Sequence, residues 1–326
     1  KSMDEHFSAR TAWFAGSLFE RTGQMDKAKD VYLKLQENYP LTTFTSLAIA
    51  RLEKGIKSPL LHKVTPEDGM MSGLFDLASV LQQERSSRLA LLYGQVANYL
   101  VPDDPFLRIL MGDIQYESNN LEDALISYSS IKENSDFFVM AQTRLAKVYE
   151  EEGDLDKAIS ILEKMSKNAD VSESVLMILG DLLRRNEQFD RAIPYYTKVV
   201  DSLDGNYVAE HWELFYARGV AYEQNGQWPK AEADLQQALE LEPDQPYVLN
   251  YLGYSWLEKG TNLDEAIKMI EKAVEQSPQD GYIVDSLGWA LYRMEQYDEA
   301  VGWLEKAIML RPEDPTINDH LGDAYW

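Results

Sequence analysis

Two consecutive stretches decide the fold: PYVLNYLGYSWLEKGTNLDEAIKMIEKAVEQSPQD at 246–280 and GYIVDSLGWALYRMEQYDEAVGWLEKAIMLRPED at 281–314. Each has a leucine–glycine pair in its first half, and the two glycines, Gly253 and Gly288, lie 35 residues apart. The same order of alanine, large apolar residue, alanine and proline follows in both. A period of this length indicates stacked supersecondary units rather than one globular core.

The period continues through nearly the whole chain. Gly219 lies 34 residues before Gly253, and further small residues follow upstream at Gly180, Ala146, Gly112 and Ala78. Near the start, Gly16 opens another copy. We therefore expect repeats at 9–42, 71–104, 105–138, 139–172, 173–206, 212–245, 246–280 and 281–314.

Each repeat predicts two helices. In 281–314, the first helix carries small and apolar residues at helical spacing: Val284, Leu287, Gly288 and Leu291. The second helix carries a matching stripe: Ala300, Leu304 and Ala307. The small residues allow the two helices to approach closely. Residues that tolerate a left-handed backbone mark the end of the first helix in several copies: Gly23, Asn119, Gly153, Gly226 and Gly260.

This pattern resembles the tetratricopeptide repeat. The resemblance implies an all-α, right-handed α-solenoid of antiparallel helix pairs. The runs 245–256, 280–292 and 314–326 further resemble a group of long proteobacterial tetratricopeptide proteins, which are often exported or lipid-anchored. A related envelope lipoprotein serves as adaptor for a carboxyl-terminal processing protease, so the resemblance implies an adaptor of this kind.

Three regions are expected from the rhythm of the repeats. Residues 1–55 form an N-terminal repeat and a half-repeat, 56–70 form a proline-containing loop between two lobes, and 71–326 form a solenoid of about seven repeats plus a truncated helix. Residues 207–211 are inserted and predict a longer turn or an extra helical turn. Because the last helix lacks a partner, we expect the sequence to be a piece of a longer protein.

Composition excludes several classes of function. The 326 residues include 31 basic and 55 acidic side chains, a net charge of −24, with no cysteine and only four scattered histidines. Nucleic acid is therefore not expected as a partner, because phosphate contacts need clustered Lys and Arg. No run of residues is long and apolar enough to insert into a membrane. No nucleophile, phosphate-loop or metal motif occurs, so we expect no enzyme, no cofactor and no bound metal.

A second stripe on the first helices supplies the candidate binding residues. It is rotated by roughly 100° from the core stripe, and in tetratricopeptide arrays this stripe lines the concave groove. The predicted binding residues are Tyr216, Asn250, Tyr254, Asp285, Trp289, Tyr292, Arg293, Asp319 and Asp323. Two alternatives stay open: Trp289 and Tyr254 pack against the adjacent repeat, and Asp285 and Asp319 form hydrogen bonds between repeats.

These residues predict a non-catalytic scaffold or adaptor. Aromatic side chains among carboxylates suit a protein or peptide partner with apolar and basic side chains, and self-association is left open. The alternative is a regulatory or substrate-docking region of a longer enzyme whose catalytic domain lies outside this sequence. For the compartment, the bacterial periplasm or envelope is favoured over the cytoplasm, with an anchor in a missing N-terminus.

Overall fold

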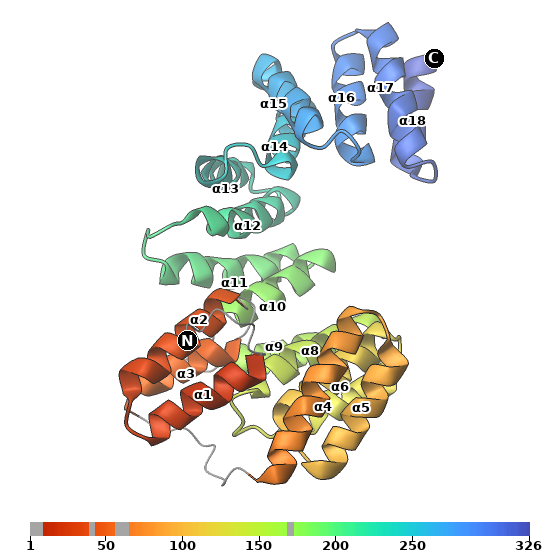
Figure 1. The fold of residues 1–326 in the computed structure, drawn as a ribbon. Helices are drawn as coiled ribbons and strands as arrows, with labels where there is room; N and C mark the ends of the chain where they lie inside the picture. Colours follow the sequence, from red (N-terminus) through yellow and green to blue (C-terminus); the bar gives the residue numbers. More distant parts are fainter. Residues whose placement is uncertain (1–8, 39–42, 56–64, 168–172) are drawn as a thin grey trace. The chain divides into compact units, whose positions relative to one another are not determined.

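The computed structural model describes residues 9–38, 43–55, 65–167 and 173–326. These residues form helices joined by turns, and no strand occurs among them. The chain divides into two compact units, Lys1–Leu179 and Gly180–Trp326. The expected all-α repeat solenoid is confirmed, and Figure 1 shows successive helix pairs in the order of the sequence.

The first unit is built from nine helices and the start of a tenth among its described residues. They are α1 (Ala9–Arg21), α2 (Met25–Asn38), α3 (Thr43–Glu53), α4 (Pro66–Gln83), α5 (Ser87–Leu100), α6 (Pro105–Glu117), α7 (Leu121–Ser129), α8 (Phe138–Glu151), α9 (Leu155–Ser166) and α10 (Glu173–Arg185), which contains the boundary between the units.

The second unit continues from α10. It contains α11 (Phe189–Ser202), a 3₁₀ turn (Ala209–His211), α12 (Trp212–Gln224), α13 (Trp228–Leu241), α14 (Pro246–Lys259), α15 (Leu263–Gln276), α16 (Gly281–Arg293), α17 (Tyr297–Leu310) and α18 (Pro315–Tyr325). The 3₁₀ turn lies in the insertion at 207–211, where the sequence predicts an extra turn.

The small residue of each first helix makes room for a side chain of the second helix. A Cβ on Gly112 would lie 2.4 Å from Cε1 of Tyr128, and one on Gly288 would lie 2.6 Å from Cγ of Leu304. Tyr128 and Leu304 are both almost completely buried. The sequence predicts a close approach of the helices here. In both repeats, the space beside the glycine is filled by the large side chain of the residue sixteen positions later, Tyr128 or Leu304.

A buried tyrosine also links successive repeats of the first unit. The hydroxyl of Tyr128 donates to Oδ1 of Asp113 at 2.6 Å, and Arg144 from α8 donates to Oδ2 of the same carboxylate at 3.0 Å. Burial and the neighbouring charge of Asp113 raise the pKa of Tyr128, so its hydroxyl stays protonated and remains a donor. The contact therefore joins the pair α6–α7 to the next first helix.

The N-terminal helices pack against the middle of the first unit. Trp13 of α1 is fully buried, with ring centroids 6.2 Å from Phe106 and 5.6 Å from Phe137. Arg51 of α3 donates to Asp136 at 2.7 Å. The described part of residues 1–55, which were predicted as a separate lobe, thus shares a core with the helices that follow, and Figure 1 shows α3 beside α8.

The predicted loop at 56–70 is partly helical. Residues 56–64 lie outside the described residues, but α4 begins at Pro66, so the loop prediction is wrong for 66–70. Thr65 caps the helix: Asp68 N donates to its Oγ1 at 3.3 Å, and Thr65 N donates to Oδ2 of Asp68 at 2.7 Å. Proline in the first helical turn costs little because its missing N–H would have no helical partner there.

The predicted turn residues adopt the left-handed backbone. Gly23, Gly153, Gly226 and Gly260 have φ between 66° and 80°, and Asn119 has φ 58°. Three residues at the equivalent place are neither glycine nor asparagine. They are Arg85 (φ 58°), Glu187 (φ 57°) and Glu295 (φ 63°).

Candidate protein-binding face of the second unit

The predicted stripe lies on the first helices of the second unit. Tyr216 is on α12, Asn250 and Tyr254 are on α14, and α16 and α18 carry the remaining residues. Helix α16 packs against both α14 and α18, so these three helices form one continuous surface. We call the nine predicted residues the C-terminal stripe.

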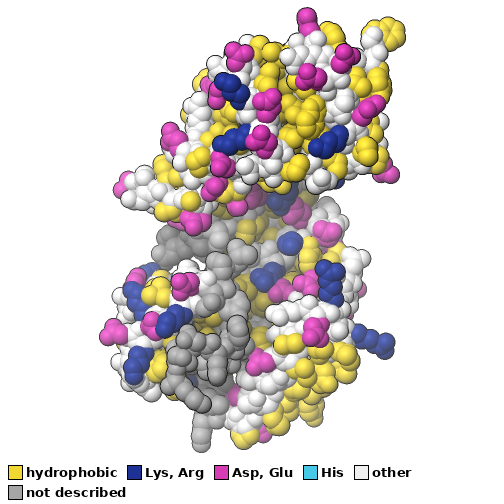
Figure 2. Space-filling view, turned by 45° about the horizontal axis from the view of Figure 1, so that its top comes forward, with side chains coloured by type: hydrophobic (Ala, Val, Ile, Leu, Met, Phe, Trp, Pro, Cys, Tyr) yellow, Lys and Arg dark blue, Asp and Glu magenta, His cyan; other side chains and the backbone are white. Residues whose placement is uncertain are grey.

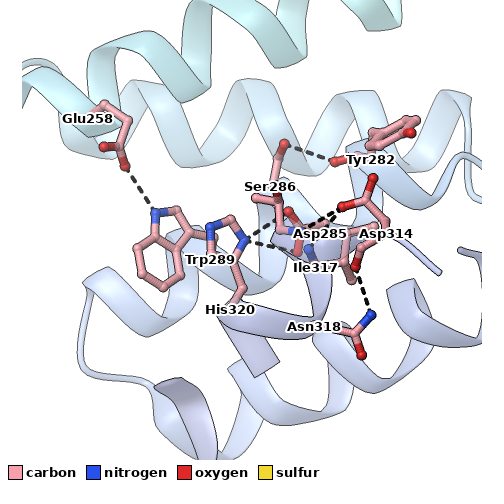
Figure 3. A network of polar contacts seen from close by, with 10 residues as sticks. Glu258, Tyr282, Asp285, Ser286, Trp289, Asp314, Ile317, Asn318 and His320 are labelled. Atoms are coloured by element: carbon pink, nitrogen blue, oxygen red, sulfur yellow. Dashed lines mark hydrogen bonds and ion pairs between the residues drawn. The ribbon is translucent and has the colours of Figure 1, made fainter. Parts of the chain in front are cut away.

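An aromatic stack runs along this surface. The ring of Trp289 lies 4.1 Å from the ring of His320 with an angle of 13° between the planes. Tyr292 stacks on Trp289 at 4.9 Å and 19°. Trp289 and Tyr292 keep part of their surface exposed, whereas His320 is buried. The stack therefore joins α16 to α18, as Figure 3 shows for Trp289 and His320. Trp289 and Tyr292 still offer aromatic surface to solvent.

Glu258 of α14 accepts hydrogen bonds from two residues of the stripe. The indole Nε1 of Trp289 donates to Oε1 of Glu258 at 3.0 Å, and Nη1 of Arg293 donates to the same oxygen at 2.9 Å. These exposed contacts connect α14 to α16. Glu258 was not among the predicted binding residues, although it occupies the repeat position of Arg293, which lies 35 residues further on.

Asp285 is a structural residue rather than an open binding residue. Its carboxylate is buried and lies 3.0 Å and 3.1 Å from Nδ1 of His320 on α18. This contact corresponds to the alternative of a hydrogen bond between repeats, so the placement of Asp285 on an open stripe is corrected. A buried carboxylate needs such a partner because removing its charge from water is costly.

His320 is therefore a residue that sequence reasoning missed. It follows Asp319 directly, and its position in the repeat is polar in the two preceding copies as Tyr251 and Ser286. That position is a signal for a polar contact between repeats, but the sequence does not tell which partner it meets.

Tyr254 lies close enough to Glu258, Asp285 and Arg293 for their charges to affect its pKa. Its side chain is half-buried, and burial, followed by the carboxylates of Glu258 and Asp285, raises its pKa to about 12. The positive charge of Arg293 lowers the pKa of Tyr254 and so opposes this shift in part. The phenol is therefore a neutral hydrogen-bond donor at physiological pH, suited to a carbonyl or carboxylate acceptor on a ligand.

Tyr216 belongs to a separate aromatic cluster. Its ring meets Tyr251 edge-on at 5.9 Å and lies 6.2 Å from Trp212. Burial raises its pKa. Tyr216 is thus anchored between α12 and α14 and presents less of its ring to a ligand than an open stripe residue would.

Asn250 carries an unsatisfied acceptor. Its Oδ1 is buried and has no hydrogen-bond partner among the described residues. A buried amide oxygen without a donor is unfavourable by about 1–3 kcal/mol, and a donor supplied from outside would remove that cost.

Asp319 and Asp323 are exposed on α18. Neither carboxylate forms an ion pair with another described side chain. Arg293 is paired with Glu258, so the unpaired charge at this end of the stripe is negative.

Among the described residues, no three His, Cys, Asp or Glu side chains are placed to hold a metal ion. None of the described helices is both long and apolar enough to cross a membrane.

Family models match most of this architecture. Models described as "Tetratricopeptide repeat" match residues 15–42, 143–207, 179–246 and 216–281, and one described as "TPR repeat" matches 288–326. Together they cover more than half of the chain. The chain belongs to the tetratricopeptide-repeat family.

Relatives and solved structures agree with this assignment. A TPR repeat-containing protein of Pseudomonas aeruginosa is 30% identical over 184 residues, which are 56% of this chain and 30% of the relative. The chain thus spans about a third of that protein's length. A tetratricopeptide repeat protein from Parabacteroides merdae has a TM-score of 0.59 at 16% identity, covering 79% of this chain and 100% of the other.

The fold also extends to a component of a larger assembly. The APC/C heterotetramer Cut9–Hcn1 has a TM-score of 0.59 at 16% identity, covering 98% of this chain and 55% of the other. At such identities the likeness concerns the fold alone. Tetratricopeptide-repeat proteins are in general scaffolds for protein–protein interaction, and this tetratricopeptide-repeat protein is one in that general sense.

Proposed function

We propose that this tetratricopeptide-repeat protein is a non-catalytic adaptor that binds a segment of a partner protein across α14, α16 and α18. One observation carries the proposal: Tyr254, Trp289 and Tyr292 keep aromatic surface exposed beside the open carboxylates Asp319 and Asp323. Partly exposed aromatic side chains held by their neighbours are typical anchors of protein interfaces.

The chemistry of the face defines the partner segment. An apolar side chain would pack on Trp289 and Tyr292, and flanking Lys or Arg would approach Asp319 and Asp323. Oδ1 of Asn250 would accept a hydrogen bond from a backbone N–H of the segment, because it lacks a donor within the described part of the chain. Charges at the edge of such a contact raise the association rate at low salt more than they raise the final affinity.

A peptide library tests this proposal. The probes are dodecapeptides with one central Leu, Phe or Trp flanked by Lys and Arg, and a matched set flanked by Asp and Glu. We expect the basic set to bind and the acidic set not to bind, by fluorescence anisotropy. Trp289→Ala should weaken binding of the basic set by about 2 kcal/mol, roughly 30-fold in Kd.

Trp303→Ala is the matched control. Trp303 lies half-buried on α17, which is the second helix of its repeat, so it is not part of the C-terminal stripe. Nζ of Lys306 lies 4.7 Å from the centroid of its ring. Its loss should leave peptide affinity unchanged. If Trp289→Ala lowers the melting temperature and leaves the affinity unchanged, Trp289 only packs against the next repeat and the proposal fails.

The charge component has its own test. Replacing Asp319 and Asp323 together by Asn removes two exposed carboxylates without changing shape. The dependence of the association rate on salt should become weaker, while the dissociation rate changes little. An unchanged salt dependence would show that the partner's basic side chains do not meet α18.

We further propose that the adaptor acts in the bacterial envelope, where it would bring a partner such as a protease to its substrates. The resemblance of 245–256, 280–292 and 314–326 to exported proteobacterial tetratricopeptide proteins supports this location. Fractionation of the native cell with an antibody to this region tests it, and recovery in the soluble cytoplasmic fraction would contradict it.

A further inference from the structure

Helix α5 exposes an apolar stripe to solvent. The stripe consists of Leu89, Leu92, Val96 and Tyr99, with 49%, 52%, 44% and 85% of each residue exposed. The intervals of three, four and three residues are those of a coiled-coil seam. The opposite face of α5, with Ala90, Gly94 and Ala97, is buried. Helix α5 is therefore apolar on the side away from the core as well.

The same positions are polar in other repeats. In α9 and its C-cap they are Lys157, Ser160, Lys164 and Lys167, and on α15 they are Glu265, Lys268, Lys272 and Glu275. All are exposed except Lys272, which is partly exposed, as expected for the outer side of a second helix. Only in α5, among the second helices that the structure describes, are all four positions large and apolar. The architecture of the repeat does not require this stripe.

The neighbouring helix enlarges the apolar surface. Helix α4 packs along α5 and exposes Met70, Leu77 and Val80. Between residues 70 and 100 only Asp76, Glu84, Arg85 and Arg88 are charged, in a chain that is 26% charged overall. Hydrophobic side chains gather over this hairpin in the lower right of Figure 2. Contiguous exposed apolar surface of this kind marks an interaction site.

We propose that the α5 stripe is the interface with a second copy of this chain. The two α5 helices would pack antiparallel about a two-fold axis level with Gly94. In that arrangement Leu92 of one copy faces Val96 of the other, and Leu89 faces Tyr99, because each pair is equally spaced about Gly94. A two-fold interface requires one patch to be complementary to itself, and this spacing meets the requirement.

The charges at the two ends of α5 support the antiparallel arrangement. Arg85 and Asp103 each lie nine residues from Gly94, on opposite sides, so Arg85 of one copy would approach Asp103 of the other. The Asp103 side chain is 67% exposed although it also contacts Arg108 at 3.2 Å. Both ends of the interface would thus bring unlike charges together.

The seam itself carries no charge, which suits two chains of net charge −24 each. Their acidic surfaces can stay apart while apolar residues meet. A membrane surface fits less well, since helices that lie on membranes carry rows of Lys and Arg on the polar face, and an anionic bilayer would repel this chain.

Sedimentation velocity over a concentration series tests the proposal. The whole chain should sediment as a dimer, twice 37.3 kDa, at micromolar concentration. Leu92→Glu should raise the dimer Kd on the order of 100-fold or more, because a two-fold axis places the substitution in the interface twice. Far-UV circular dichroism and the melting temperature should change little, since Leu92 is half exposed.

Ile126→Glu is the matched control. Ile126 occupies the equivalent position on α7 and is 58% exposed, so the substitution is chemically the same outside the stripe. It should leave the dimer intact. A wild-type chain that stays monomeric throughout the series, or a dimer that Leu92→Glu does not weaken, would overturn the proposal.

A charge exchange tests the orientation. Arg85→Glu alone and Asp103→Lys alone should each weaken the dimer, and the two together should restore it, because the exchanged charges meet again across the axis. If the double variant is weaker than both single variants, the helices do not pair antiparallel about Gly94 and the proposed interface is wrong.

Discussion

Replacing Gly288 by alanine tests the packing inside a repeat. A Cβ at this position would lie 2.6 Å from Cγ, 2.8 Å from Cδ2 and 3.1 Å from the backbone N of Leu304. Carbon atoms in contact normally lie about 3.5–4.0 Å apart, so roughly 1 Å of movement is needed. Leu304 is fully buried and cannot move outward without displacing its neighbours.

The expected magnitude follows from two opposing effects. Alanine in a helix interior is more favourable than glycine by about 1 kcal/mol. Inserting a methyl group into a filled core is unfavourable by about 1–3 kcal/mol. Because the second helix is held at its backbone as well as its side chain, we expect the upper part of that range. Gly288→Ala should therefore destabilise the pair α16–α17 by about 1–2 kcal/mol.

Gly302→Ala provides the control in the same repeat. Gly302 is a helical residue of α17 with no atom within 4 Å of a built Cβ, so only the helix preference remains. It should stabilise by about 0.5–1 kcal/mol. The two substitutions should change the stability in opposite directions, so the two variants should differ by about 1.5–3 kcal/mol.

Native-state hydrogen exchange of α16 and α17 amides measures both variants locally, since single repeats can open without global unfolding. Exchange in Gly288→Ala should be roughly 10- to 150-fold faster than in Gly302→Ala. Equal stabilisation by both substitutions would refute the inference that the absence of a side chain at Gly288 makes room for Leu304.

Three further predictions follow from the second unit. His320→Leu should destabilise it by about 2 kcal/mol or more in urea denaturation, because Asp285 stays buried without its partner; a stable variant would mean that the carboxylate can reach water. Tyr254 has a folded-state pKa of about 12 against roughly 10 when unfolded, so its stabilising contribution is complete below about pH 10 and is lost as the pH rises toward 12. In an ultraviolet titration, Tyr254→Phe should therefore lose the absorbance change of one tyrosine near pH 12 and show a shallower decline in stability over that range, and an unchanged titration would contradict the assignment. Glu295→Gly should stabilise by up to about 1 kcal/mol, since φ is 63° there, whereas Gly260→Ala at φ 66° should destabilise by about 1 kcal/mol; thermal unfolding that moves both variants in the same direction would refute this reasoning.

Part of the candidate site could be predicted from the sequence. The helical repeat angle placed Tyr254, Trp289 and Tyr292 on one face, and all three lie partly exposed on the surface of α14 and α16. The same angle could not tell that Asp285 would be covered by α18. Coverage depends on how closely the next helix approaches, and that distance is set by packing between repeats rather than by the direction of one side chain.

The sequence by itself determined the repeat unit: its period, its two helices, the small residue at which the helices approach closely, and the left-handed turn at Gly153 or Gly260. Each of these depends on residues within one repeat, so a local pattern contains all the information needed. Only the tertiary structure decided that Trp13 packs against Phe106 and Phe137 and that His320 reaches Asp285. Those contacts join different repeats, and they result from the accumulated angles between helices, which no residue pattern within one repeat specifies.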